Sequence, residues 1–315
     1  MAQDLNIEVE IEEYDWEYFH SHPFVLFLHV ILSIFIVLIG IIGNAVIVAV
    51  KITKVRQLKA VDILIVNLAI SSILYCSLIL LQLSDDAYGS LYLTLCYVKF
   101  IVIHHSAISF ILTISALIII SKFFCDLDKS CGYYIVAIIW IIAVFVAYPY
   151  VSLEMYDYPT STGTEIYFCA PKVEEYEAFC ALEVNLLIIE YLVPTLVLAG
   201  SSAYLSKSLK TENFVINKNV YHYSVFVGLL HIISIIPTIA FILLFYGTID
   251  ISFISSILLC YLYYFVVPSN VFVICYFDRE FYKEVLESFE ILIGRKFDNR
   301  DLESLIKDTA SDEAF

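Results

Sequence analysis

The sequence lacks the patterns that identify catalytic and metal-binding chains. It contains no glycine-rich phosphate loop, no nucleophile–base set and no zinc-type spacing among its eight cysteines. It also lacks an internal repeat, which disfavours a secondary transporter because the halves of such proteins usually mirror one another. We therefore expect no enzymatic activity, no metal and no cofactor. A channel or transporter is the least favoured of the remaining classes, and no nucleic-acid partner is expected.

Charged residues are also scarce, at 16 % of the chain, whereas 61 % of the residues are hydrophobic. A soluble domain holds roughly 45–50 % apolar residues. The excess is grouped in long runs with almost no charge, and a helix needs about 20 such residues to cross a bilayer. Seven runs have this character: Phe24–Val50, Ala60–Leu83, Tyr97–Ile120, Gly132–Leu153, Ala181–Leu205, Tyr221–Tyr246 and Ile251–Phe277. Because an open sheet would leave unpaired edges in lipid, we predict an all-α membrane protein, a bundle of seven transmembrane helices.

Three regions follow along the chain. Residues 1–23 form an acidic N-terminus without the basic start of a cleavable signal peptide, so the first apolar run is expected to act as the insertion signal. Residues 24–277 form the bundle. Residues 278–315 begin with an amphipathic pattern over Asp278–Ile293, which predicts a short helix along the inner membrane surface, and end in a polar tail. The segment Glu154–Thr164 is typical of an exposed loop or hairpin.

The cations predict the orientation of the bundle. Except for Lys99 and Lys172, the 17 Lys and Arg residues all lie in the tail or near the connections that follow spans one, three and five. The positive-inside rule places these segments in the cytoplasm, and therefore the N-terminus outside the cell. The net charge of −16 then falls heavily on the outer face. Such a surface would steer a cationic ligand inward, or it would simply be a solvated acidic ectodomain.

One carboxylate within the apolar runs is a binding candidate. Glu190 lies four residues before Pro194 in the fifth run. A carboxylate in a membrane span is costly unless paired, so it marks a functional site. The alternative is that Glu190 faces an outer vestibule and remains solvated.

Motifs and prolines within the predicted helices resemble those of the rhodopsin-like G-protein-coupled receptors. Gly43-Asn44 in span one, Asn67-Leu68-Ala69 in span two and Trp140 in span four are similar to motifs of that family. Single prolines in spans five and six, Pro194 and Pro237, extend the match across nearly the whole chain. The resemblance also implies a disulfide between Cys96 and Cys169, and both residues would face an oxidising compartment.

Within that class the chain is most similar to chemokine receptors. The spacing from Trp140 to Pro149 and the segment Asp278–Phe281 carry this likeness. At the N-terminus, two tyrosines stand among acids, the arrangement that tyrosyl sulfation requires. The predicted ligand-binding residues there are Glu12, Glu13, Tyr14, Asp15, Glu17 and Tyr18. The resemblance implies a basic chemokine-type ligand held by sulfotyrosines, while an unmodified acidic tail is the alternative.

Several switch residues of the family are absent. Ser72 stands where the family has a sodium-binding Asp, and Ile235 where it has a Trp. Asn270–Ile274 lacks the proline and tyrosine of the family's Asn-Pro-x-x-Tyr. In place of Asp-Arg-Tyr, the segment expected to face a G protein is Ser121-Lys122-Phe123, or the triplet one residue earlier.

These losses predict atypical or weak signalling through a heterotrimeric G protein or arrestin. The alternative is a non-signalling scavenger, or a membrane protein that pairs with a host receptor. Divergence of this kind resembles a receptor captured by a large DNA virus, a poxvirus or herpesvirus, and placed in the host plasma membrane.

Overall fold

The structure is a computed structural model. It describes residues 23–54, 58–88, 93–124, 127–147, 153–159, 165–171, 218–246 and 269–293, together with seven positions within 192–200 and residue 266. The described chain is almost entirely helical. Its helices are α2 (Pro23–Lys54), α3 (Ala60–Tyr88), α4 (Leu93–Phe123), α5 (Lys129–Ala147), α8 (Lys218–Tyr246), α10 (Asn270–Phe277) and α11 (Arg279–Ile293).

Four of these helices are long enough and apolar enough to cross a membrane. The qualifying windows are Val30–Thr53, Ala60–Leu78, His104–Ser121 and Lys129–Val146. Their length and composition confirm the prediction of a membrane-embedded, multi-pass α-helical protein. The crossing number of seven stays a prediction, as does the crossing in the fifth run, where only scattered positions are described.

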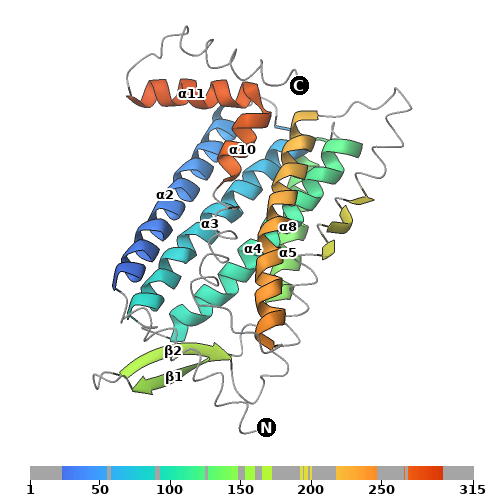
Figure 1. The fold of residues 1–315 in the computed structure, drawn as a ribbon. Coiled ribbons are helices and arrows are strands. Elements are labelled where there is room, and N and C mark those ends of the chain that lie inside the picture. Colours follow the sequence, from blue (N-terminus) through green and yellow to red (C-terminus); the bar gives the residue numbers. More distant parts are fainter. Residues whose placement is uncertain are drawn as a thin grey trace.

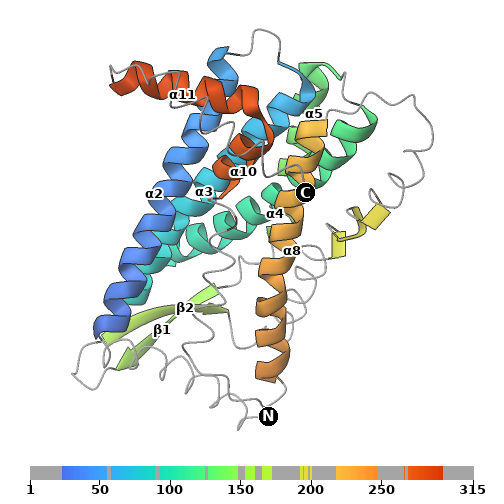
Figure 2. The same ribbon diagram turned by 45° about the horizontal axis from the view of Figure 1, so that its top comes forward.

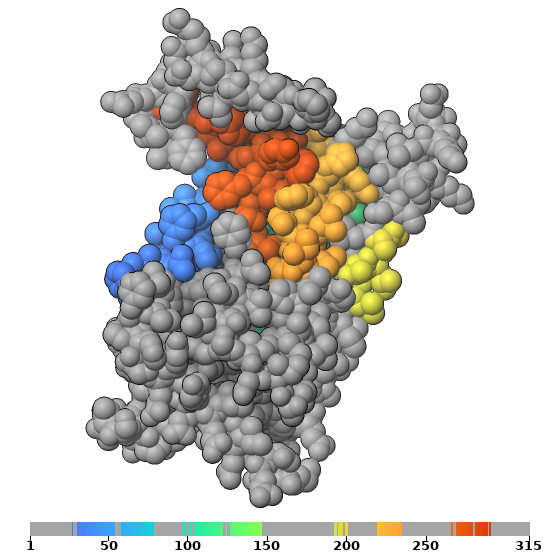
Figure 3. Space-filling model, viewed as in Figure 1, coloured from blue at the N-terminus to red at the C-terminus, as the bar shows by residue number. Residues whose placement is uncertain are grey.

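The helices pack as a bundle with two different ends (Figure 1). Helix α3 lies between α2 and α4, α4 also contacts α5 and α8, and α10 contacts both α2 and α8. Helix α11 lies across the end where α2 finishes and α3 begins; we call this the α11 end (Figures 1 and 2). In the space-filling view, α11, α10 and α8 adjoin on one face of the molecule (Figure 3).

A β-hairpin lies at the opposite end, which we call the hairpin end (Figure 1). Strand β1 (Leu153–Pro159) pairs antiparallel with β2 (Glu165–Pro171), with Met155 opposite Cys169. Strand β1 overlaps the segment Glu154–Thr164, which was predicted as an exposed loop or hairpin, whereas β2 begins directly after that segment. The hairpin is therefore part of the connection that follows α5.

The burial pattern fits a bundle surrounded by lipid. Leu64 and Leu68 of α3 and Ile111 and Ile114 of α4 are fully buried at the centre. In contrast, apolar side chains on the outer helices are exposed, among them Phe35 on α2 and Phe145 on α5. Hydrocarbon solvates such side chains as well as a protein interior does, so their exposure carries no penalty in a bilayer.

A glycine brings α5 close to the beginning of α3. A Cβ atom on Gly132 would lie 2.9 Å from the Cα of Ala60 and 3.0 Å from the Cβ of Ile63. The first of these atoms belongs to the main chain, so a rotamer change cannot relieve the contact. The residue at this position therefore sets how closely α3 and α5 approach.

We predict that Gly132→Ala lowers the free energy of unfolding by about 1–3 kcal/mol, because overpacking must displace one of the two helices. Thermal unfolding in detergent micelles measures the effect. Gly200→Ala is the matched control, since a Cβ there meets nothing within 4 Å. Equal unfolding temperatures for the two variants would contradict the proposed close contact.

Candidate functional site

The predicted ligand-binding residues lie outside the described part of the chain. These are Glu12, Glu13, Tyr14, Asp15, Glu17, Tyr18 and Glu190. For the predicted disulfide, the structure places the backbone only: Cys96 is in the first turn of α4, and Cys169 is in β2. Because α4 contacts β1 at the hairpin end, both cysteines belong to the same end of the molecule. Their side chains are not among those described, so the disulfide stays a prediction.

The predicted G-protein-facing segment ends α4 at the α11 end. Ser121 is fully buried, and its Oγ donates a hydrogen bond to the carbonyl of Ile118 at 3.3 Å. Its hydroxyl is therefore turned into the bundle and is not available to a partner in this conformation. Lys122 and Phe123 are helical, but their side chains lie outside the described set.

One buried amide joins three helices near the middle of the bundle. The Nδ2 of Asn67, on α3, donates to Thr113 Oγ1 of α4 at 2.7 Å. The indole Nε1 of Trp140, on α5, donates to Asn67 Oδ1 at 2.7 Å. An asparagine amide both donates and accepts, so a single side chain can satisfy two different helices.

His105 extends this cluster toward the hairpin end. Its ring meets that of Trp140 edge-on, with centroids 4.8 Å apart, and its Nε2 lies 3.4 Å from the Trp140 carbonyl oxygen. One turn further along α4, the hydroxyl of Ser109 is hydrogen-bonded to that of Ser71 on α3, at 2.9 Å. Neutral polar contacts therefore connect α3, α4 and α5 at several positions along their length.

A second buried chain joins α2, α10 and α8. The hydroxyl of Tyr223 donates to Asn270 Oδ1, and Asn270 Nδ2 donates to Asn44 Oδ1 at 3.1 Å. Asn44 Nδ2 in turn donates to the carbonyl of Gly40 at 2.8 Å. Next to this chain a Cβ on Gly43 would lie only 2.5 Å from Val271 Cγ1. Helices α2 and α10 thus approach closely where their asparagines meet.

The groups in these clusters are suited to connecting helices. The position that resembles the sodium-binding Asp holds Ser72, which is buried and donates to the Leu68 carbonyl at 2.8 Å. Among the described residues, no group of three or more His, Cys, Asp or Glu side chains could hold a metal ion. The clusters consist of amides, hydroxyls and two aromatic heterocycles, which orient helices and define their packing.

Sequence reasoning found only some of these residues. Asn44, Asn67 and Trp140 were marked by their motifs, and Asn270 by a motif that is incomplete. Thr113 and Tyr223 were missed. Nothing local distinguishes Tyr223 among the 24 tyrosines of the chain, because its role depends on a partner 47 residues away.

No protein-family model matches the chain, and no curated protein matches it. Any functional proposal therefore depends on the sequence and structure of this chain alone.

We predict that Tyr223→Phe lowers the free energy of unfolding by about 0.6 kcal/mol, the average for hydrogen bonds between membrane helices, and by no more than about 1.7 kcal/mol. The substitution removes the Tyr223 hydroxyl, which donates a hydrogen bond from α8 to Asn270, and keeps the ring. Thermal unfolding of the purified protein is the measurement. Tyr133→Phe, which alters an exposed tyrosine on α5, is the control and should leave the unfolding temperature unchanged.

Proposed function

We propose that the chain is a chemokine-receptor-like membrane protein, embedded in the plasma membrane with its N-terminus outside. The observation that carries the proposal is the set of hydrogen bonds that its motif residues make between helices. Asn44, Asn67, Trp140 and Asn270 were singled out by resemblance to receptor motifs, and each makes a hydrogen bond between helices. The proposal gains support because the residues that carry the resemblance also connect α2, α3, α5 and α10.

The proposed ligand is a basic chemokine-type protein. The acids and tyrosines of residues 12–18 would make the first contact, and sulfation of Tyr14 and Tyr18 would add fixed negative charge for Lys and Arg of the ligand. Glu190 would receive the cationic N-terminus of the ligand in the vestibule of the bundle. The acidic outer face would accelerate association at low salt.

On the cytoplasmic side we propose weak or atypical coupling to a heterotrimeric G protein or arrestin. The segment Ser121-Lys122-Phe123 supports this, because Lys122 could replace the family's Arg as a point charge but lacks its planar fork. The same observation favours the second candidate, a scavenger that binds chemokines without signalling or pairs with a host receptor. Capture by a large DNA virus would explain why the packing contacts persist while the switch residues do not.

We predict that the double variant Tyr14→Phe, Tyr18→Phe weakens chemokine binding and reduces its dependence on salt. A screen of purified full-length protein against basic chemokines identifies the ligand, and titration at two ionic strengths gives the dissociation constants. The control is Tyr133→Phe, Tyr134→Phe, a pair of exposed tyrosines at the α11 end. If binding by the Tyr14, Tyr18 variant equals that of the control, the sulfotyrosine role is wrong.

The two functional candidates differ in their response to the bound ligand. We predict that cells expressing the chain internalise labelled chemokine but activate G protein weakly, because Lys122 lacks the planar guanidinium fork of the family's Arg. Uptake and G-protein activation are measured in the same cells. Robust ligand-dependent activation would exclude the non-signalling scavenger.

A further inference from the structure

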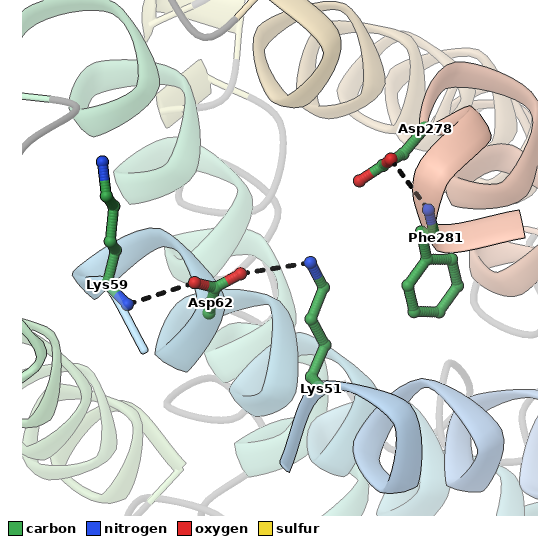
Figure 4. Close-up of polar contacts among 5 residues, drawn as sticks. All are labelled: Lys51, Lys59, Asp62, Asp278 and Phe281. Atoms are coloured by element: carbon green, nitrogen blue, oxygen red, sulfur yellow. Dashed lines mark hydrogen bonds and ion pairs between the residues drawn. The ribbon is translucent and has the colours of Figure 1, made fainter. Parts of the chain in front are cut away.

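The last turn of α2 holds a largely buried cation. The side chain of Lys51 is only 9 % exposed, and its Nζ lies 3.1 Å from Asp62 Oδ1 of α3. On another side the same ammonium faces the ring of Phe281, 5.5 Å from its centroid (Figure 4). A buried ammonium is costly without such partners, and an aromatic face attracts a cation more strongly when water is excluded. Lys51 therefore joins α2 to both α3 and α11.

Asp62 is held in place independently of Lys51. It is the third residue of α3, and its Oδ2 accepts a hydrogen bond from the backbone N–H of Lys59 at 3.1 Å (Figure 4). This is the acidic half of a capping box at a helix N-terminus. The carboxylate thus presents its second oxygen to Lys51 from a fixed position.

Phe281 is the aromatic partner from α11. Its backbone N–H donates to Asp278 Oδ1 at 3.0 Å, so the first turn of α11 is capped where the ring projects (Figure 4). Phe281 is fully buried, and Val285, one turn later on the same face, is buried as well. Arg279, Lys283 and Glu287 are exposed. The buried stripe of α11 therefore begins at Phe281, the residue that contacts the Lys51 ammonium.

The apolar stripe of α11 has two possible resting places. An amphipathic helix buries such a stripe equally well in the boundary between lipid headgroups and acyl chains. Apolar burial alone consequently does not hold α11 against α2 and α10. The bundle differs from lipid because it contains a buried ammonium, that of Lys51, held in place by the carboxylate of Asp62.

We propose that Lys51, set by Asp62, is a clamp that docks α11 through the face of Phe281, and that α11 leaves the bundle for the membrane surface when this cation is removed. The proposal concerns the chain itself and does not depend on its being a receptor. Docked and released α11 are then two states of one helix, and the contact between Lys51 and Phe281 selects between them.

The test follows the thiol reactivity of a cysteine on the buried face of α11. Val285→Cys is introduced into the full chain, which is purified in lipid nanodiscs. It is reacted with a lipid-soluble maleimide, because the released stripe would face the boundary between headgroups and acyl chains. Peptide mapping by mass spectrometry then gives the labelling rate of each cysteine separately. The native Cys76, which is fully buried, reports global unfolding. Lys129→Met controls for the loss of one positive charge at the α11 end.

We expect Lys51→Met to raise the labelling rate at position 285 by about tenfold, in line with a desolvated cation–π contact. Phe281→Leu should do the same, and the two together should add nothing, because each removes the same contact. Asp62→Asn keeps an oxygen for the Lys59 N–H but removes the charge that fixes Lys51, so labelling should rise again. Cys76 and the Lys129→Met control should stay at the original rates.

The proposal would be overturned if Lys51→Met left the labelling rate at position 285 unchanged. It would also be overturned if the effects of Lys51→Met and Phe281→Leu on this rate multiplied in the double variant. Either result would mean that the apolar stripe alone holds α11. If rapid Cys76 labelling shows that Lys51→Met is unfolded, the other two variants decide the matter. Rates at position 285 that stay unchanged in both Phe281→Leu and Asp62→Asn would then overturn it.

Discussion

The cost of an unpaired polar group away from water governs how these helices are arranged. In lipid, a buried amide or hydroxyl must find its partner within the bundle. Asn67 meets this demand by bonding to both Thr113 and Trp140, and Asn270 does so by bonding to both Asn44 and Tyr223. Each asparagine serves two neighbouring helices, so the direction of its amide sets their relative rotation. The apolar contacts around it add area but little directional preference.

The α11 end meets the same demand with charge instead of amides. The Lys51–Asp62 pair connects α2 to α3 there, and each of the two partly desolvated charges is offset by the other. This end is also where main-chain bonds connect α3 to the α4–α5 link, through Ala60 N–H and the Leu127 carbonyl at 3.1 Å. The bundle is thus held by neutral groups at its centre and by ionic groups at one end.

The pattern of kept and lost residues supports the functional proposal. The side chains that resemble receptor motifs connect helices, whereas Ser72 and Ser121 stand where those motifs have an Asp, and both hydroxyls are buried. Both hydroxyls bond to carbonyls of their own helix, which leaves the packing undisturbed. Selection for a stable, ligand-binding scaffold would produce this combination, even without selection for a switch.

Composition and periodicity alone determined the helical membrane class, the approximate positions of α2 to α5 and α8 and the amphipathic segment that forms α11, because these depend on local apolar runs. The end of the fourth run was wrong, since Leu153 belongs to β1. Motif resemblance also marked Asn44, Asn67 and Trp140. Only the tertiary structure decided that Tyr223 reaches Asn270, and that Lys51 lies between Asp62 and Phe281. The physical reason is that each of these contacts depends on how helices distant in sequence are rotated and spaced. Close approaches such as that of Gly132 to Ala60 set this geometry, and no local pattern encodes it.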